Sequence, residues 1–198
     1  MAPKTLVINL LLSGVLIVGA YQFYFWCQRN HFFEPREFNV SVDRWIPYQP
    51  SWVWIYSLLY YPALLAVNLA AKTGEQFTHV AVSYLLLLAL QAICFLLFPV
   101  STPAIWRNFN TGGNQAERFL LLVQRFDKPT NSFPSMHTSV AMLTALHLYP
   151  EYGGWVMLFP TLIGLSCLFT KQHYLIDVPA GAGLGWLVFQ AYVRFIDA

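Results

Sequence analysis

Residues 5–26 read TLVINLLLSGVLIVGAYQFYFW and contain no charged side chain. A helix needs about 20 apolar residues to cross the hydrocarbon core of a bilayer. Lys4 precedes the run, as in a secretory signal peptide, but the run is longer than the apolar part of such peptides and no small-residue cleavage site follows it. We therefore expect a retained transmembrane helix.

Five further apolar runs follow the first one. Trp and Tyr side chains crowd the start of the second run, and such aromatic residues favour the headgroup level of a membrane. With six spans, the two termini share one side of the membrane, and the polar segments 28–50, 101–133 and 171–173 share the other. Further helices are expected at 51–71, 77–99, 134–150, 155–170 and 173–193.

The composition agrees with an all-α membrane protein. Of 198 residues, 57% are hydrophobic and only 10% are charged, against about 25% charged in a soluble domain. We expect one integral membrane domain, 1–198, built as a six-helix bundle. The net charge of +2 gives no reason to expect a nucleic-acid partner. Gly181 and Gly185 form a GxxxG step, which allows close helix packing.

Two short strings place ionisable groups at the edges of these runs: NSFPSMH at 131–137 and HYLID at 173–177. Such groups are costly in a membrane and are functional candidates. His173 and Asp177 are spaced i, i+4, which predicts one helical face. The carboxylate can then fix the imidazole tautomer and make the other nitrogen a better nucleophile.

The second histidine, His137, is expected at the start of a helix, after Pro134 and Ser135. A helix N-terminus attracts phosphate groups. Cations lie just upstream of both histidines, and the joint set favours phosphoryl transfer. These cations are Arg107, Arg125, Lys128 and Lys171.

The two strings resemble signatures of the type 2 phosphatidic acid phosphatase superfamily. Residues 133–137 resemble its Pro-Ser-Gly-His signature, and Ser166, His173 and Asp177 resemble its third signature, Ser-Arg, five residues, His, three residues, Asp. The resemblance covers about 98–185. It implies that His173 attacks phosphorus, that Asp177 orients it, that His137 protonates the leaving oxygen, and that Ser135 holds the phosphate. It implies no metal and no cofactor.

Three positions depart from the family pattern. The first signature, Lys, six residues, Arg-Pro, is missing, and Arg107 is the nearest substitute. Cys167 stands where the third signature has arginine, with Lys171 as a possible replacement, and Met136 stands in place of a glycine. These changes resemble the branch that contains inositol phosphorylceramide synthases, which transfer a phosphorylated headgroup to a lipid alcohol.

The leading hypothesis is a membrane phosphatase that acts on a lipid phosphate such as phosphatidic acid, phosphatidylglycerophosphate or a polyprenyl phosphate. The alternative is a lipid phosphotransferase with the same histidine intermediate. A proton-coupled carrier and a metal site built from His137, His173 and Asp177 are further alternatives. The expected partners are the lipid substrate and membrane lipids, and the sequence does not reveal the oligomeric state.

Two criteria predict opposite orientations of the protein in the membrane. Most Arg and Lys residues lie on the side of the two histidines, and the positive-inside rule alone would place that side in the cytoplasm. The resemblance implies the periplasmic, luminal or extracellular face. Because several of these cations are candidate phosphate ligands, we favour the face that the resemblance implies.

Overall fold

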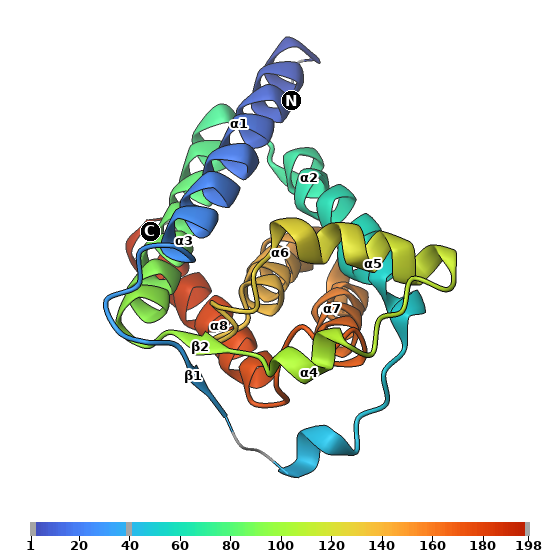
Figure 1. The fold of residues 1–198 in the computed structure, drawn as a ribbon. Helices are drawn as coiled ribbons and strands as arrows, with labels where there is room; N and C mark the ends of the chain where they lie inside the picture. The colour runs from blue at the N-terminus through green and yellow to red at the C-terminus, as the bar shows by residue number, and fades with distance from the viewer. Residues whose placement is uncertain (1–2, 39–40, 197–198) are drawn as a thin grey trace.

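The computed structural model describes residues 3–38 and 41–196, and nearly all of its regular structure is helical. Figure 1 shows α6, α7 and α8 grouped together, with α1 and α3 along one side. A single pair of two-residue parallel strands, β1 and β2, is found in the described ranges. The long helices are α1 (Pro3–Cys27), α2 (Tyr60–Ala70), α3 (Gly74–Leu97), α6 (Met136–Tyr152), α7 (Leu158–Phe169) and α8 (Asp177–Phe195).

Within the described residues, four segments are long and apolar enough to cross a membrane, which indicates a membrane-embedded protein. They are Pro3–Cys27, Pro50–Ala70, Gly74–Leu97 and Met136–Phe169. The last segment includes both α6 and α7, which are joined by the 3-10 helix η4 (Gly153–Met157) and pack against each other. The expected six crossings therefore stay a prediction, although helices were found near all six predicted positions.

Helices α6 and α8 pack closely against each other. A Cβ atom on Gly181 would overlap the carbonyl group of Ser135, and one on Gly185 would overlap that of Ser139. Side chains there would push the helices apart, so the expected packing role of the GxxxG step is confirmed. The main core lies beside this contact, with Ala141, Leu143, Ile163, Cys167 and Val188.

The segment 101–133, expected as a loop, contains two helices. They are α4 (Ala104–Arg107) and α5 (Gln115–Phe126). Asn114 caps α5 by accepting a hydrogen bond from the backbone N–H of Glu117 at 2.9 Å. Ala116 and Leu120 are buried with Val53, which explains why an amphipathic helix forms here.

The N-terminal polar segment crosses the same end of the bundle as this loop. Its strand β1 (Arg36–Glu37) pairs with β2 (Val100–Ser101). A 3-10 helix, η1 (Ser41–Arg44), follows and carries the buried side chain of Asp43. Strands β1 and β2 thus lie side by side at the edge of the helix group, and α4 follows β2 (Figure 1).

Candidate active site

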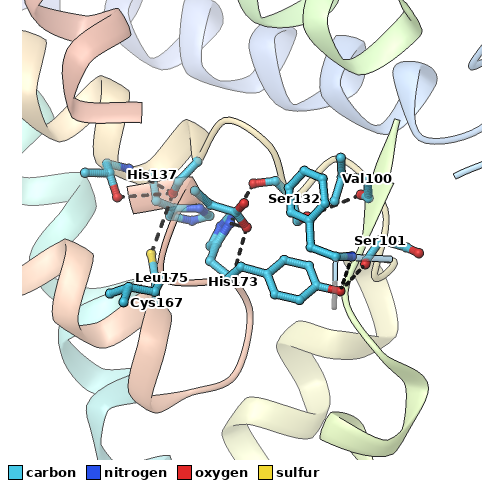
Figure 2. A network of polar contacts seen from close by, with 12 residues as sticks. Val100, Ser101, Ser132, His137, Cys167, His173 and Leu175 are labelled. Carbon is cyan, nitrogen blue, oxygen red and sulfur yellow. Dashed lines mark hydrogen bonds and ion pairs between the residues drawn. The ribbon is translucent and has the colours of Figure 1, made fainter. Parts of the chain in front are cut away.

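His173 lies in the turn between α7 and α8, with its ring held on one side. Its Nδ1 lies 2.8 Å from the carbonyl oxygen of Ser132 and 3.3 Å from Oδ2 of Asp177 (Figure 2). A carbonyl oxygen can only accept a hydrogen bond, so Nδ1 carries the proton. In the neutral imidazole the other nitrogen, Nε2, then has a free lone pair and is suited to nucleophilic attack.

His173 and Asp177 meet in a different way from the one expected. Helix α8 begins at Asp177, four residues later than predicted, so His173 belongs to a turn and not to a helical face. Asp177 Oδ2 also accepts a hydrogen bond from the backbone N–H of Tyr174 at 2.9 Å. The i, i+4 spacing still brings the pair together, because this carboxylate closes the turn.

Residues from distant segments also form hydrogen bonds with the turn that carries His173. The sequence did not predict these contacts. Asp43 accepts a hydrogen bond from the backbone N–H of Leu175 at 2.7 Å. Tyr174 donates its hydroxyl hydrogen to the Ser101 carbonyl and accepts from the N–H of Phe38, both at 3.0 Å. Segments distant in sequence therefore fix the backbone around His173, and no local pattern could have identified them.

His137 occupies the first turn of α6 and faces the same space as His173. The centres of the two rings are 6.3 Å apart. Nδ1 of His137 lies 3.2 Å from the hydroxyl oxygen of Tyr56, whose ring stacks on the imidazole with centres 4.2 Å apart. Tyr56 was not predicted as a site residue, and its stacking fixes the orientation of the imidazole.

Ser135 caps α6 and is fully buried. Its hydroxyl oxygen lies 3.3 Å from the backbone N–H of Thr138 and 3.1 Å from the Thr138 hydroxyl, and both donate to it. The Sγ atom of Cys167 lies 3.9 Å away (Figure 2). The third signature's arginine position therefore falls directly beside Ser135, and an uncharged thiol occupies it.

The predicted phosphate-binding cations differ in their surroundings. Lys171 donates a hydrogen bond from Nζ to the carbonyl oxygen of Asp43 at 2.8 Å, and Nζ lies 5.2 Å from the centre of the Trp106 ring. Arg107 donates to the carbonyl oxygens of Gln124 and Asp127 at 2.9 and 2.7 Å. Burial lowers the pKa of both cations. The remaining two, Arg125 and Lys128, are exposed.

An acidic residue, Asp127, also lies near the site and was not predicted as a site residue. Its Oδ1 accepts hydrogen bonds from Gln28 Nε2 at 2.7 Å and from the Tyr24 hydroxyl at 2.9 Å. Burial raises the pKa of Asp127, and the two donors, together with Arg107 and His173, oppose that rise. A carboxyl group thus lies within electrostatic range of the candidate nucleophile.

Two adjoining cavities extend from this site into the bundle. The first, of about 230 Å³, is lined by His137, Asp127 and Tyr56 among other residues. The second, of about 120 Å³, is almost entirely apolar and lies among α1, α2, α3 and α6. Tyr21, Tyr60 and Met136 line both, so the two cavities share a wall.

The chain belongs to the PAP2 superfamily, whose family model matches residues 37–191. The match includes both histidines, Asp177 and the segments that cover them. Proteins of this superfamily are generally phosphatases, so phosphatase-type activity is indicated. Assignment to the inositol phosphorylceramide synthase branch stays a prediction.

A further similarity is to an uncharacterized protein of Methanocaldococcus jannaschii. The two sequences are 34% identical over 67 residues, which is 33% of this chain and 28% of that protein. The alignment thus spans well under half of either protein. No solved structure matches the chain significantly.

Proposed function

We propose that the protein is an integral membrane phosphatase that hydrolyses the phosphomonoester or pyrophosphate of a lipid through a phosphohistidine on His173. The observation that carries this proposal is the pairing of His173 Nδ1 with the Ser132 carbonyl and with Asp177. In the neutral ring this pairing leaves Nε2 free to attack phosphorus, and Asp177 can stabilise the positive charge that the ring gains during attack.

In the first step, Nε2 of His173 forms a bond to phosphorus while the bond from phosphorus to the lipid oxygen breaks. His137 gives a proton to that oxygen, and the lipid alcohol leaves, or the lipid monophosphate where the substrate is a pyrophosphate. In the second step, His137 takes a proton from water, the water oxygen bonds to phosphorus, and the phosphorus–nitrogen bond breaks. The ring centres of the two imidazoles lie 6.3 Å apart, so both rings border one site and can contact different atoms of one phosphate group.

A lipid substrate is supported by the apolar cavity. Its lining comes from spanning helices, including Leu16, Ile17, Leu64 and Leu88. It adjoins the cavity lined by His137, where the leaving alcohol would lie. A hydrocarbon tail in the apolar cavity and a phosphate at His173 are therefore compatible with one ligand.

The test is phosphate release from a panel of lipid phosphates by purified protein, with and without EDTA. We expect wild-type activity to survive EDTA and His173→Ala to reduce it at least 10³-fold. His31→Ala, which changes a histidine of the N-terminal polar loop, is the matched control and should retain activity. Full activity of His173→Ala would refute the proposed nucleophile, and loss of wild-type activity in EDTA would refute metal independence.

Phosphotransfer is a second candidate, favoured by the uncharged surroundings of Ser135. Without the signature arginine, the pocket carries less positive charge for a phosphomonoester dianion and suits a singly charged phosphodiester better. His173 would take the phosphorylated headgroup from a phosphodiester lipid and pass it to an alcohol. A new phosphodiester on addition of acceptor would support this candidate, and release of headgroup phosphate alone would count against it.

We also propose that the site faces the periplasm, lumen or exterior. The lipid substrate would reach it laterally from that leaflet. Labelling of an Asn114→Cys variant with a membrane-impermeant maleimide, in intact cells and in inverted vesicles, tests this orientation. Labelling only in inverted vesicles would place the site in the cytoplasm.

A further inference from the structure

The cavity beside His137 contains a carboxyl group that the proposed mechanism does not use. Both hydrogen bonds that Asp127 accepts from side chains, those of Gln28 and Tyr24, go to Oδ1. Oδ2 takes part in neither of them, and Asp127 lines the cavity together with His137. One carboxylate oxygen is thus anchored, while the residue borders the space that the leaving group would occupy.

An acid is unfavourable next to a phosphate unless it contacts a hydrogen-bond donor. A negatively charged oxygen in a half-buried site repels phosphate and loses hydration, and a further hydrogen-bond donor beside it reduces this cost. Gln28 and Tyr24 already fix the orientation of the carboxyl group. A hydroxyl group of the ligand could supply a further donor to Oδ2.

The position of Asp127 limits where that donor lies on the ligand. The cavity is bordered by His137, the proposed acid for the leaving oxygen, and shares Tyr21, Tyr60 and Met136 with the apolar cavity. A lipid placed with its phosphate at His173 and its tail in the apolar cavity would pass through the cavity that Asp127 borders, between the phosphate and the tail. The donor therefore belongs close to the phosphate and not along the tail.

We infer that Asp127 is a specificity-determining residue that selects lipid phosphates with a free hydroxyl group close to the phosphoester. This inference rests on the proposed function. The hydroxyl hydrogen would be donated to Oδ2 of Asp127. Polyprenyl phosphates and simple alkyl phosphates lack such a donor and would leave Oδ2 without a hydrogen bond from the ligand, which makes discrimination strong.

The experiment compares three lipid phosphates with the same tail. The first carries a free hydroxyl on the carbon next to the phosphoester carbon, the second carries a methoxy group there, and the third carries hydrogen. We expect wild-type kcat/KM to favour the hydroxyl lipid over the other two at least 10-fold. Hydrolysis of all three at similar rates would overturn this inference while leaving the proposed function intact, and hydrolysis of none would refute the proposed function itself.

Two variants assign the preference to Asp127. Asp127→Leu should bring the rates on the three lipids to within about threefold of each other, by lowering the rate on the hydroxyl lipid. Gln28→Leu is the matched control, because it removes one partner of Oδ1 but leaves the carboxylate, and it should keep the preference. A preference that persists in Asp127→Leu would overturn the assignment.

Asp127→Asn covers the case in which the leucine variant does not fold. Its amide oxygen can keep the hydrogen bonds from Gln28 and Tyr24, while an N–H group replaces the second oxygen. The methoxy lipid, which can only accept a hydrogen bond, should then gain at least threefold relative to wild type. An unchanged rate on the methoxy lipid would contradict direct contact between Asp127 and this substituent.

Discussion

The two sides of the helical bundle are packed in different ways. Where α6 meets α8, Gly181 and Gly185 bring the helix backbones together without intervening side chains. On the opposite side, α1 buries only three of its residues, Asn9, Tyr24 and Cys27, and borders the apolar cavity. The candidate catalytic groups belong to the tightly packed side, and the proposed tail site belongs to the loosely packed side.

This difference follows from what each side is proposed to do. Attack on phosphorus needs His173, His137 and Ser135 at fixed positions, and a close backbone contact provides them. A hydrocarbon tail needs only an apolar space, which a loosely packed helix can provide. Changes on the tight side should therefore affect kcat, and changes on the loose side should affect KM for lipids.

The largest effect on activity is expected from Asp177→Asn, through a fall in kcat. The amide can still accept a hydrogen bond from the N–H of Tyr174, so the turn is kept, but it no longer stabilises a positive charge on His173. We expect kcat to fall on the order of 10³-fold with little change in KM, measured by steady-state phosphate release. A loss below tenfold would show that Asp177 only shapes the turn.

A smaller effect is expected from adding one methyl group between α6 and α8. In Gly181→Ala the new carbon would overlap the carbonyl group of Ser135 and displace the start of α6. We expect a loss of about 1–3 kcal/mol in stability and a clear fall in kcat, measured by thermal unfolding in detergent and by turnover.

Gly183→Ala is the matched control for this change. It lies on the same helix, and a Cβ atom there would meet nothing within 4 Å. Alanine favours the helix over glycine by up to about 1 kcal/mol, so this variant should be as stable as wild type or more stable. Equal behaviour of the two variants would contradict a special role for the α6–α8 contact.

Much of the fold could be predicted from the sequence, because long apolar runs have few alternatives in a membrane. The helix α5 was missed although its signals are local. Asn114 and Glu117 have cap spacing, and Ala116, Leu120 and Val123 recur at helical intervals. The charged side chains of this segment give it the composition of a polar loop, which obscures that periodicity.

The candidate site was only partly predictable, for a physical reason. The i, i+4 spacing of His173 and Asp177 brings them together in a turn as well as in a helix. The partners of Lys171 and Arg107, in contrast, are backbone carbonyls of Asp43, Gln124 and Asp127. Such contacts depend on how distant loops pack, and no local sequence pattern predicts them.

A moderate effect is expected at the contact between η1 and the His173 turn. Asp43→Ala removes the acceptor for the N–H of Leu175, whereas Asp43→Asn can keep it. We expect Asp43→Ala to lower kcat about 5- to 20-fold and Asp43→Asn to stay within about threefold of wild type. Equal losses in the two variants would indicate that the charge of Asp43, and not its hydrogen bond, supports the turn.

The smallest effect is expected on the loosely packed side, in Ala20→Trp. Ala20 lines the apolar cavity, and an indole there would fill space that the tail is proposed to use. We expect KM for a long-chain lipid phosphate to rise about 3- to 10-fold, with kcat and the rate on a short-chain, water-soluble phosphomonoester unchanged. Val18→Trp is the matched control, because Val18 lies on the same helix with 61% of its surface exposed.

If Ala20→Trp instead lowers kcat on both substrates, the two sides are mechanically coupled and the proposed division between them is wrong. If it changes neither parameter, the tail lies elsewhere, and the apolar cavity reflects only the loose packing of α1.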